Sequence, residues 1–148
     1  MIGSSQRMMT VWCWAMIVFG AGLMGAAFGP TDGPTSFLFN ILGGVTLTWD
    51  TPLRFAVGLM GAVTFGWGLT VLAVTSVSHL LETEVARLLW RRIATALGAW
   101  YVVDCAISIT NGFGLNAVSN TMLTAAFFLI ALKSGVLAPP QIRRQSRA

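Results

Sequence analysis

The stretch LRFAVGLMGAVTFGWGLTVLAVTSV, residues 53–77, decides the fold of this chain. After Arg54 it contains no charged side chain, and it is longer than the roughly 20 apolar residues that a helix needs to cross a bilayer. Its apolar residues are continuous rather than alternating with polar ones, which favours a helix over a barrel strand. The stretch is therefore predicted to be a membrane-spanning helix.

Three further stretches have the same character. The predicted spans are Met9–Phe28, Leu53–Val77, Ile93–Thr110 and Leu115–Leu132. Only 9% of the 148 residues are charged and 55% are hydrophobic, whereas a soluble domain carries about 25% charged residues. The first stretch is longer than the core of a signal peptide, so we expect it to remain as a span. We predict an all-α integral membrane four-helix bundle that forms a single domain, residues 1–148.

Lysine and arginine residues predict the orientation of the bundle. They cluster before the first span, between the second and third, and after the fourth: Arg7, Arg87, Arg91, Arg92, Lys133, Arg143, Arg144 and Arg147. The other two loops hold only Arg54. The positive-inside rule then predicts that both termini are cytoplasmic, and we expect a bacterial inner membrane. Because these charges flank spans and meet anionic headgroups, the net charge of +4 predicts a lipid partner and no nucleic acid.

The first outer loop contains a short apolar helix. Thr35–Leu42 reads as helical and is ended by Gly43-Gly44. The segment is too short to span the bilayer and too apolar for water. We predict an interfacial or re-entrant helix that either rests on the bundle or covers what lies below it.

The first two spans share a phrase rich in small residues. FGAGLMGA, residues 19–26, resembles FAVGLMGA, residues 55–62. Small residues that recur every four positions allow two helix backbones to approach closely. The candidate packing residues are Ala21, Gly25 and Gly29 on the first span and Gly58, Ala62 and Gly66 on the second. We predict a tight crossing of these two spans.

Asp104 is the only acid inside the long apolar runs, in the stretch WYVVDCAI, residues 100–107. A carboxylate at that depth costs several kcal/mol unless it is paired, hydrated or neutral, so it usually marks a functional site. No basic side chain lies plainly within its reach. Arg54 is one turn from Asp50 and is expected to pair with it, and Lys133 lies near the inner boundary.

Polar side chains accompany Asp104 on the last two spans. Helical spacing places three of them on one face of each span, and the candidate binding residues are Asp104, Ser108, Asn111, Asn116, Asn120 and Thr124. A hairpin turn near Phe113-Gly114 would set Asn111 opposite Asn116, Ser108 opposite Asn120 and Asp104 opposite Thr124. This polar seam has a structural alternative, because amides and hydroxyls also join membrane helices by hydrogen bonds worth about 0.6–2 kcal/mol.

Other chemistries have little support in the sequence. Thr110–Gly114 resembles the Thr-x-Gly-aromatic-Gly filter of potassium channels, but a full span precedes it, and a hairpin turn explains it better. His79 is the only histidine, so no metal site or cofactor is predicted. Cys13 and Cys105 lie at different depths, which excludes a disulfide between them. No catalytic cluster is recognised, so a non-enzymatic role is favoured and an enzyme is kept as the last alternative.

Three functions remain open at this point. The first is binding or transport of a small solute, ion or proton along the seam centred on Asp104. The second is a non-catalytic accessory or scaffold subunit of a larger membrane complex. The third is a lipid- or quinone-handling enzyme that uses Asp104 as an acid or base. Four helices leave little room for a pathway, so a homo-oligomer or a larger complex is expected.

Overall fold

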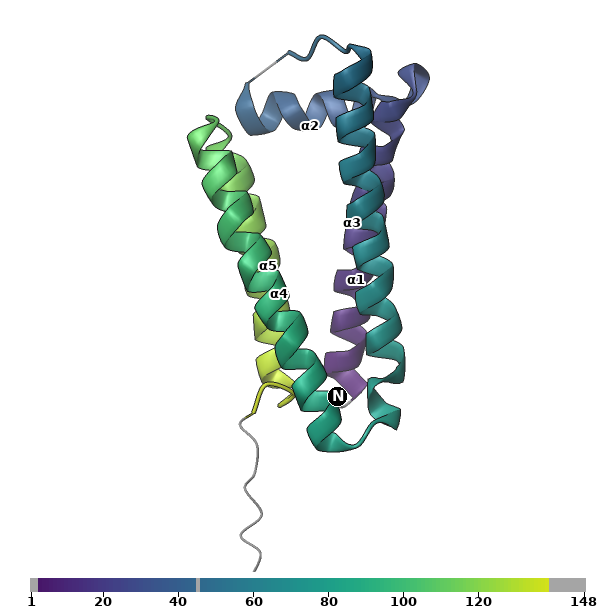
Figure 1. Cartoon of the computed structure of the whole chain (residues 1–148), viewed down its shortest axis with the longest axis vertical. Helices are drawn as coiled ribbons and strands as arrows, with labels where there is room; N and C mark the ends of the chain where they lie inside the picture. The colour runs from purple at the N-terminus through teal and green to yellow at the C-terminus, as the bar shows by residue number, and fades with distance from the viewer. Residues whose placement is uncertain (1–2, 45, 139–148) are drawn as a thin grey trace, which may run out of the picture.

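The computed structural model describes residues 3–44 and 46–138, and those residues contain helices and no β-strand. Four long helices, α1 (Gly3–Met24), α3 (Thr51–Val77), α4 (Thr83–Thr110) and α5 (Gly114–Lys133), are joined by a short α2 (Gly33–Gly43) and the 3₁₀ turns η1 (Gly25–Ala27), η2 (Gly29–Thr31) and η3 (Ser78–Leu80) (Figure 1). Each long helix, with its flanking turns, is long and apolar enough to cross a membrane. The predicted four-span, all-helical fold is confirmed at this level. The basic residues Arg143, Arg144 and Arg147 lie outside the described residues.

The helix of the third span begins earlier than the predicted span does. The predicted span is Ile93–Thr110, whereas α4 begins at Thr83 and continues without a break to Thr110. No glycine or proline interrupts the chain between Thr83 and Ile93, so nothing ends the helix there. Arg87 pairs with Glu84 at 2.8 Å on this first part of α4.

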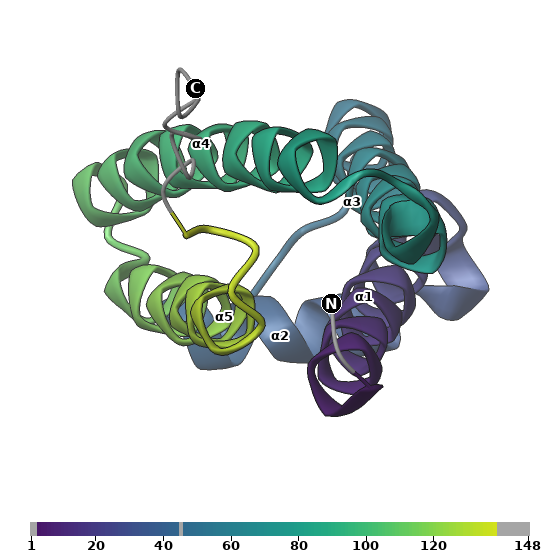
Figure 2. The same cartoon turned by 90° about the horizontal axis from the view of Figure 1, so that it is seen from below.

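The long helices form two antiparallel pairs. α1 packs along α3, and α4 packs along α5, while α1 also contacts α5 (Figure 2). Although α3 and α4 are consecutive, they make few contacts with each other. The two pairs meet at the end where α1 begins and α5 ends, which we call the closed end. They separate toward the opposite end, where α2 lies across the bundle (Figure 1). This opposite end is called the α2 end.

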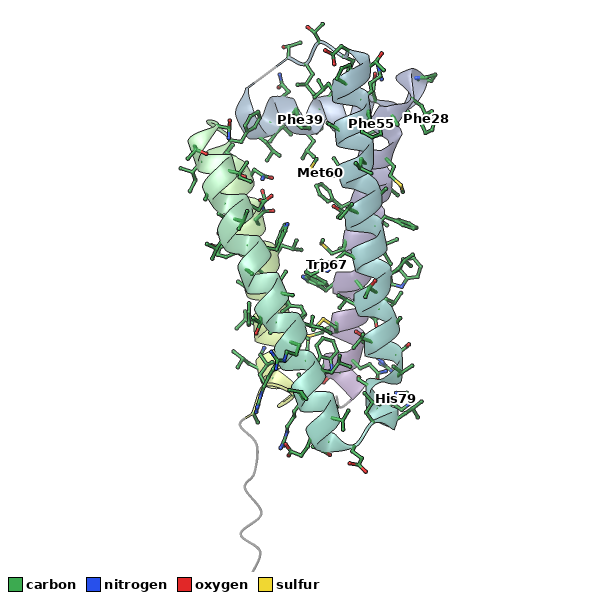
Figure 3. All side chains as sticks on the ribbon, in the orientation of Figure 1. Phe28, Phe39, Phe55, Met60, Trp67 and His79 are labelled. Carbon is green, nitrogen blue, oxygen red and sulfur yellow. The ribbon has the colours of Figure 1, made fainter. Side chains whose placement is uncertain are left out.

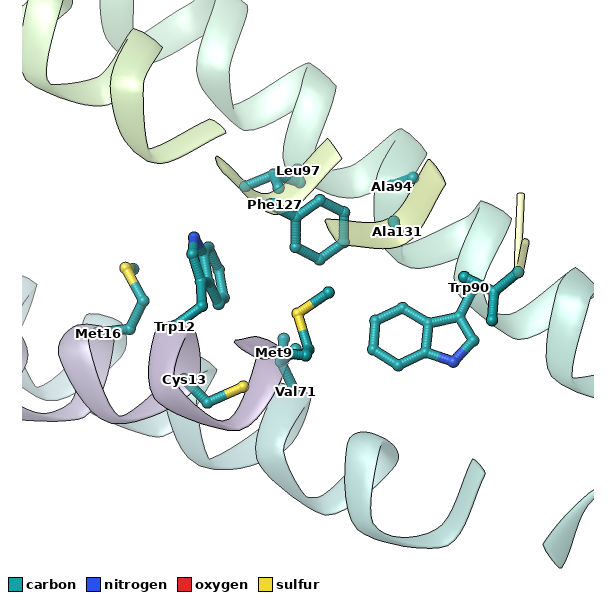
Figure 4. Packing of buried hydrophobic residues seen from close by; sticks show 11 residues of the cluster. Met9, Trp12, Cys13, Met16, Val71, Trp90, Ala94, Leu97, Phe127 and Ala131 are labelled. Carbon is teal, nitrogen blue, oxygen red and sulfur yellow. The ribbon is translucent and has the colours of Figure 1, made fainter. Parts of the chain in front are cut away.

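An aromatic cluster fills the closed end (Figure 4). Phe127 of α5 is fully buried, and its ring centroid lies 5.3 Å from that of Trp12 on α1 and 6.2 Å from that of Trp90 on α4. Trp12 Nε1 also donates to the carbonyl oxygen of Leu123 at 3.0 Å. Trp12 and Trp90 lie near the ends of predicted spans, where tryptophan commonly anchors a helix at the membrane boundary, but both side chains are buried inside the bundle. Small neighbours explain this, because buried alanines on α4 and α5 leave room for the large indole rings.

Glycines allow α1 and α3 to cross closely. A Cβ added at Gly20 would lie 2.8 Å from the carbonyl oxygen of Gly61, and a Cβ added at Gly61 would lie 2.7 Å from that of Gly20. Real Cβ atoms essentially never come so close to a backbone atom. Gly68 and Gly58 extend the contact, against Ile17 and Ala27 respectively.

The predicted packing residues lie mostly beside this crossing. Only Gly58 takes part in it. Ala21 and Ala62 are exposed, Gly66 has open space around it, Gly25 faces Thr31, and the nearest atom to Gly29 belongs to Arg54. The sequence pattern contains glycines on adjacent faces of each helix, and rotation of the helices about their axes chooses between those faces.

Polar contacts attach α2 and its loops to the bundle. Arg54 pairs with Asp32 at 2.8 Å and donates to the carbonyl oxygen of Ala26 at 3.1 Å. Asp50 instead caps α3 by accepting from the backbone nitrogen of Leu53 at 2.8 Å, so the expected pair of Arg54 with Asp50 is wrong. The predicted short helix is present as α2, and Gly44 ends it with a φ of 63°, as helix-ending glycines often do.

The two glycines of α3 provide a matched test of the crossing. Replacing Gly61 with alanine is expected to destabilise the protein by about 1–3 kcal/mol, because the new methyl group cannot fit against α1. Replacing Gly66 with alanine should stabilise it by about 0.5–1 kcal/mol, the usual gain at an open position inside a helix. Unfolding in detergent micelles, followed by circular dichroism during titration with dodecyl sulfate, measures both. A loss at Gly66 as large as that at Gly61 would place the crossing on the face that the sequence suggested.

Candidate functional site

A cavity of about 590 Å³ lies between the two helix pairs, beneath α2. Figure 3 shows Phe39, Met60 and Trp67 directed from α2 and α3 toward this space. The volume is within the range of about 300–1,000 Å³ that is typical of small-molecule sites. Most of the wall is apolar, and its polar residues are Thr64, Asp104, Ser108, Asn111, Asn116 and Asn120.

Asp104 is held by two amides of α5. Asn120 Nδ2 and Asn116 Nδ2 both donate to Asp104 Oδ2, the latter at 3.3 Å. Asn116 Nδ2 also donates to Ser108 Oγ at 2.8 Å, one helical turn beyond Asp104 on α4. We call these four side chains the Asp104 network. Both amides bind Oδ2, so the other carboxylate oxygen, Oδ1, receives no donor from α5, and Asp104 lines the cavity.

The polar faces of α4 and α5 meet, but in a different register from the predicted one. Asn120 lies opposite Asp104, and Asn116 lies opposite Ser108, so both pairs are symmetric about Gly112. The prediction had centred the turn near Phe113-Gly114. Gly112 has a φ of 83°, which reverses the chain directly after α4, and α5 begins at Gly114. Because the chain reverses at Gly112 rather than at Phe113-Gly114, α5 is shifted along α4 by about one turn of helix from the predicted register.

Two of the predicted seam residues are not part of the network. The side chain of Asn111 donates to the carbonyl oxygen of Ile107 at 2.8 Å and so closes the end of its own helix, although it lines the cavity. Thr124 is buried and lies outside the cavity wall, and its hydroxyl has no hydrogen-bond partner among the described residues. Because of the register, Asn120 occupies the place opposite Asp104 that the prediction gave to Thr124.

Part of the cavity wall consists of aromatic rings, and the predicted site did not include these residues. Trp67 of α3 and Trp100 of α4 face each other with ring centroids 6.2 Å apart. Near α2, Phe39 meets Phe113 edge to face at 5.9 Å. A sequence signal for the first pair exists, because both tryptophans lie deep within their spans rather than at the boundaries where tryptophan is usual.

Asp104 is the only charged side chain among the described residues that line the cavity. The two ion pairs of the described chain join Arg54 to Asp32 and Arg87 to Glu84, and neither includes Asp104. No group of three or more His, Cys, Asp or Glu side chains comes together in the described residues. The site therefore offers one carboxylate, three amides and two hydroxyls in an apolar surrounding.

Comparison with known proteins assigns no family to this chain. No family model matches it, and neither a curated protein nor a solved structure matches it.

A double-mutant cycle tests the Asp104 network. Asp104→Ala, Asn120→Ala and the double variant should show a coupling free energy of about 1 kcal/mol, since the two side chains share a hydrogen bond inside the bundle. The control cycle pairs Asp104→Ala with Asn111→Ala, whose side chain bonds to its own helix, and its coupling should be near zero. Unfolding in micelles supplies the free energies. Equal coupling in the two cycles would show that Asp104 is not tied to Asn120.

Proposed function

We propose that this protein binds a small solute in the cavity under α2 and moves it within or across the membrane, with Asp104 as the group that holds it. The single observation behind this proposal is Asp104 itself, a carboxylate in no ion pair of the described chain, whose Oδ1 oxygen receives neither amide of α5, in a cavity large enough for a small molecule. A carboxylate without a basic partner in an apolar wall is costly to maintain. A solute with a positive charge or a hydrogen-bond donor would offset that cost.

The hydrogen bonds of the Asp104 network favour binding over a purely structural role. A carboxylate that only joined two helices would be expected to direct both of its oxygens at donors of the partner helix. Here α5 supplies donors to one oxygen only. Asp104 is half-buried and lines the cavity, so the second oxygen remains available to a ligand.

Access to the cavity is proposed to occur from the side, between α3 and α4. The α2 end is covered by Leu38, Phe39 and Leu42, which line the cavity from above. Met60 and Val63 of α3 line the same cavity and are nevertheless 46% and 65% exposed, so they form an open edge. This edge lies within the apolar span of α3 and would face lipid rather than water.

The proposal keeps the orientation and partners that the sequence suggested. With both termini cytoplasmic, the α2 end would lie at the outer surface of the membrane. The exposed apolar side chains along all four spans would contact lipid or a second copy of the chain. A homo-oligomer would give the solute a longer path than one cavity provides.

Flux into liposomes tests the proposed transport. Purified protein is reconstituted, and the entry of protons, rubidium ions and ethidium is followed. We expect at least one probe to enter faster than into protein-free liposomes, and Asp104→Asn to lower that rate about tenfold or more, the scale of one lost charge-assisted contact. Glu82→Gln is the control, since Glu82 is an exposed acid at the closed end.

Two results would count against transport through Asp104. If all three probes enter at the rate seen in protein-free liposomes, the protein does not transport protons, small inorganic cations or organic cations of this kind. If the rate of entry is unchanged in Asp104→Asn, as in the control Glu82→Gln, then Asp104 does not hold the transported solute. Circular dichroism on both variants confirms that the fold is retained.

A second candidate function is that of an accessory subunit. It is supported by the outward face of α3, where Ala62 is exposed and Gly66 has open space, so that a helix of another protein could approach closely. Affinity purification in mild detergent should then recover a second polypeptide in fixed proportion. Replacing Gly66 with leucine should release that polypeptide and leave the fold intact. Recovery of this chain alone would contradict the accessory role.

A further inference from the structure

We infer that the solute held by the cavity is an amphiphilic organic cation, with one positive centre on a mainly apolar body. The inference rests on the proposed function, since it names the class of solute for the same cavity. Three properties of the described residues carry it: the charge of the wall, the arrangement of its aromatic rings and its size.

The charge of the wall selects a cation. Asp104 carries the only formal charge among the described lining residues, and neither ion pair of the described chain includes it. An anion would meet the carboxylate without any basic group to compensate. A neutral donor would bond to Oδ1 but leave the charge uncompensated, whereas a positive centre satisfies both needs.

The rings of the wall suit a positive centre with an organic body. Aromatic residues line the cavity from α1, α2, α3, α4 and the turn before α5: Phe19, Phe39, Trp67, Trp100 and Phe113. Trp100 and Asp104 lie four residues apart on α4, so they share one face of that helix. A cation bound to Asp104 would therefore lie about one turn from the indole of Trp100, and a cation within about 6 Å of an indole face is attracted to it. Trp67 packs against the same indole.

Size and ligand supply exclude a bare metal ion as the best fit. The cavity of about 590 Å³ is many times larger than the roughly 30 Å³ of one water molecule. Calcium takes six to eight oxygen ligands, and magnesium keeps several waters. The described residues bring together no group of three acidic or metal-binding side chains, and most of the wall is hydrocarbon. An apolar body fills this space better than hydrated inorganic charge.

Equilibrium binding of three related probes tests the inference. The probes are tetraphenylphosphonium, tetraphenylborate, which has the same shape and the opposite charge, and uncharged triphenylphosphine oxide. The full chain is placed in lipid nanodiscs, and binding to protein-free nanodiscs is subtracted to remove partition into lipid. We expect the phosphonium cation to bind about tenfold or more tightly than the borate anion, the scale of a charged contact.

Variants of cavity residues test whether the preference for the cation arises in the cavity. Asp104→Asn should weaken binding of the cation about tenfold or more and leave the uncharged probe unaffected, because it removes the charge and keeps the shape. Trp100→Leu should weaken binding of the cation about threefold or more, because the attraction of the cation to the indole ring is lost. Glu82→Gln removes an exposed acid at the closed end and should change neither affinity. The comparison of cation with anion in the unmodified protein needs no variant, so misfolding of a variant cannot hide the result.

Each other outcome overturns the inference, and the outcomes separate it from the proposed function. Equal binding of the three probes would show a binding cavity that does not select cations, and the proposed function would survive that result. An unchanged cation affinity in Asp104→Asn would overturn the inference and also the role of Asp104 in the proposed function. Binding of no probe above the protein-free nanodiscs would also overturn the inference. The flux of protons and rubidium ions would then decide the proposed function independently.

Discussion

Phe127 joins the two helix pairs, and the rest of the structure depends on that contact. Its ring is enclosed between Trp12 of α1 and Trp90 of α4, so a single side chain of α5 ties three helices together. Truncating such a buried ring to alanine typically costs about 3–5 kcal/mol. The tight cluster at the closed end permits the looser packing at the α2 end. A bundle packed to the same density along its whole length would contain no cavity.

The position of α2 follows from the same geometry. The outer parts of the helix pairs are apart, and α2 bridges them, with Thr35 donating to the carbonyl oxygen of Gly22 on α1 and Phe39 meeting Phe113 before α5. Gly43 lets the ring of Phe113 approach α2 closely, because a Cβ at that position would lie 2.5 Å from the ring and one of the two would have to shift. The cavity is thus closed below by aromatic packing and above by a helix, and its side between α3 and α4 is the part with the fewest contacts.

Much of this fold could be predicted from the sequence, because a long apolar segment in lipid has few alternatives to forming a helix. The spans, the close approach of the first two and the short loop helix follow from hydropathy, small-residue spacing and glycines. The faces that touch were not predictable in the same way. Gly20 and Gly61 differ from the neighbouring Ala21 and Ala62 only by a rotation of each helix, which depends on contacts with the other helices. The register around Asp104 depended on the φ of Gly112, a single backbone angle that changed its partner from Thr124 to Asn120.

The unequal ends of the bundle constrain how a solute could cross. A direct path along the bundle axis would have to separate Phe127 from Trp12 and Trp90, and it would expose three large rings that are buried at no more than 5% exposure. Opening at the α2 end instead requires that Phe39 leave Phe113, that Thr35 release Gly22 and Trp49 release Ser36, and that Leu38 leave the small cluster around Leu23. This change separates one pair of rings instead of three buried rings. Asp104 lies on the α2 side of the aromatic cluster, within reach of that opening and of the gap between α3 and α4. Exchange between lipid and the α2 surface therefore needs the least rearrangement, whereas passage to the closed end requires the two helix pairs to change their packing as units.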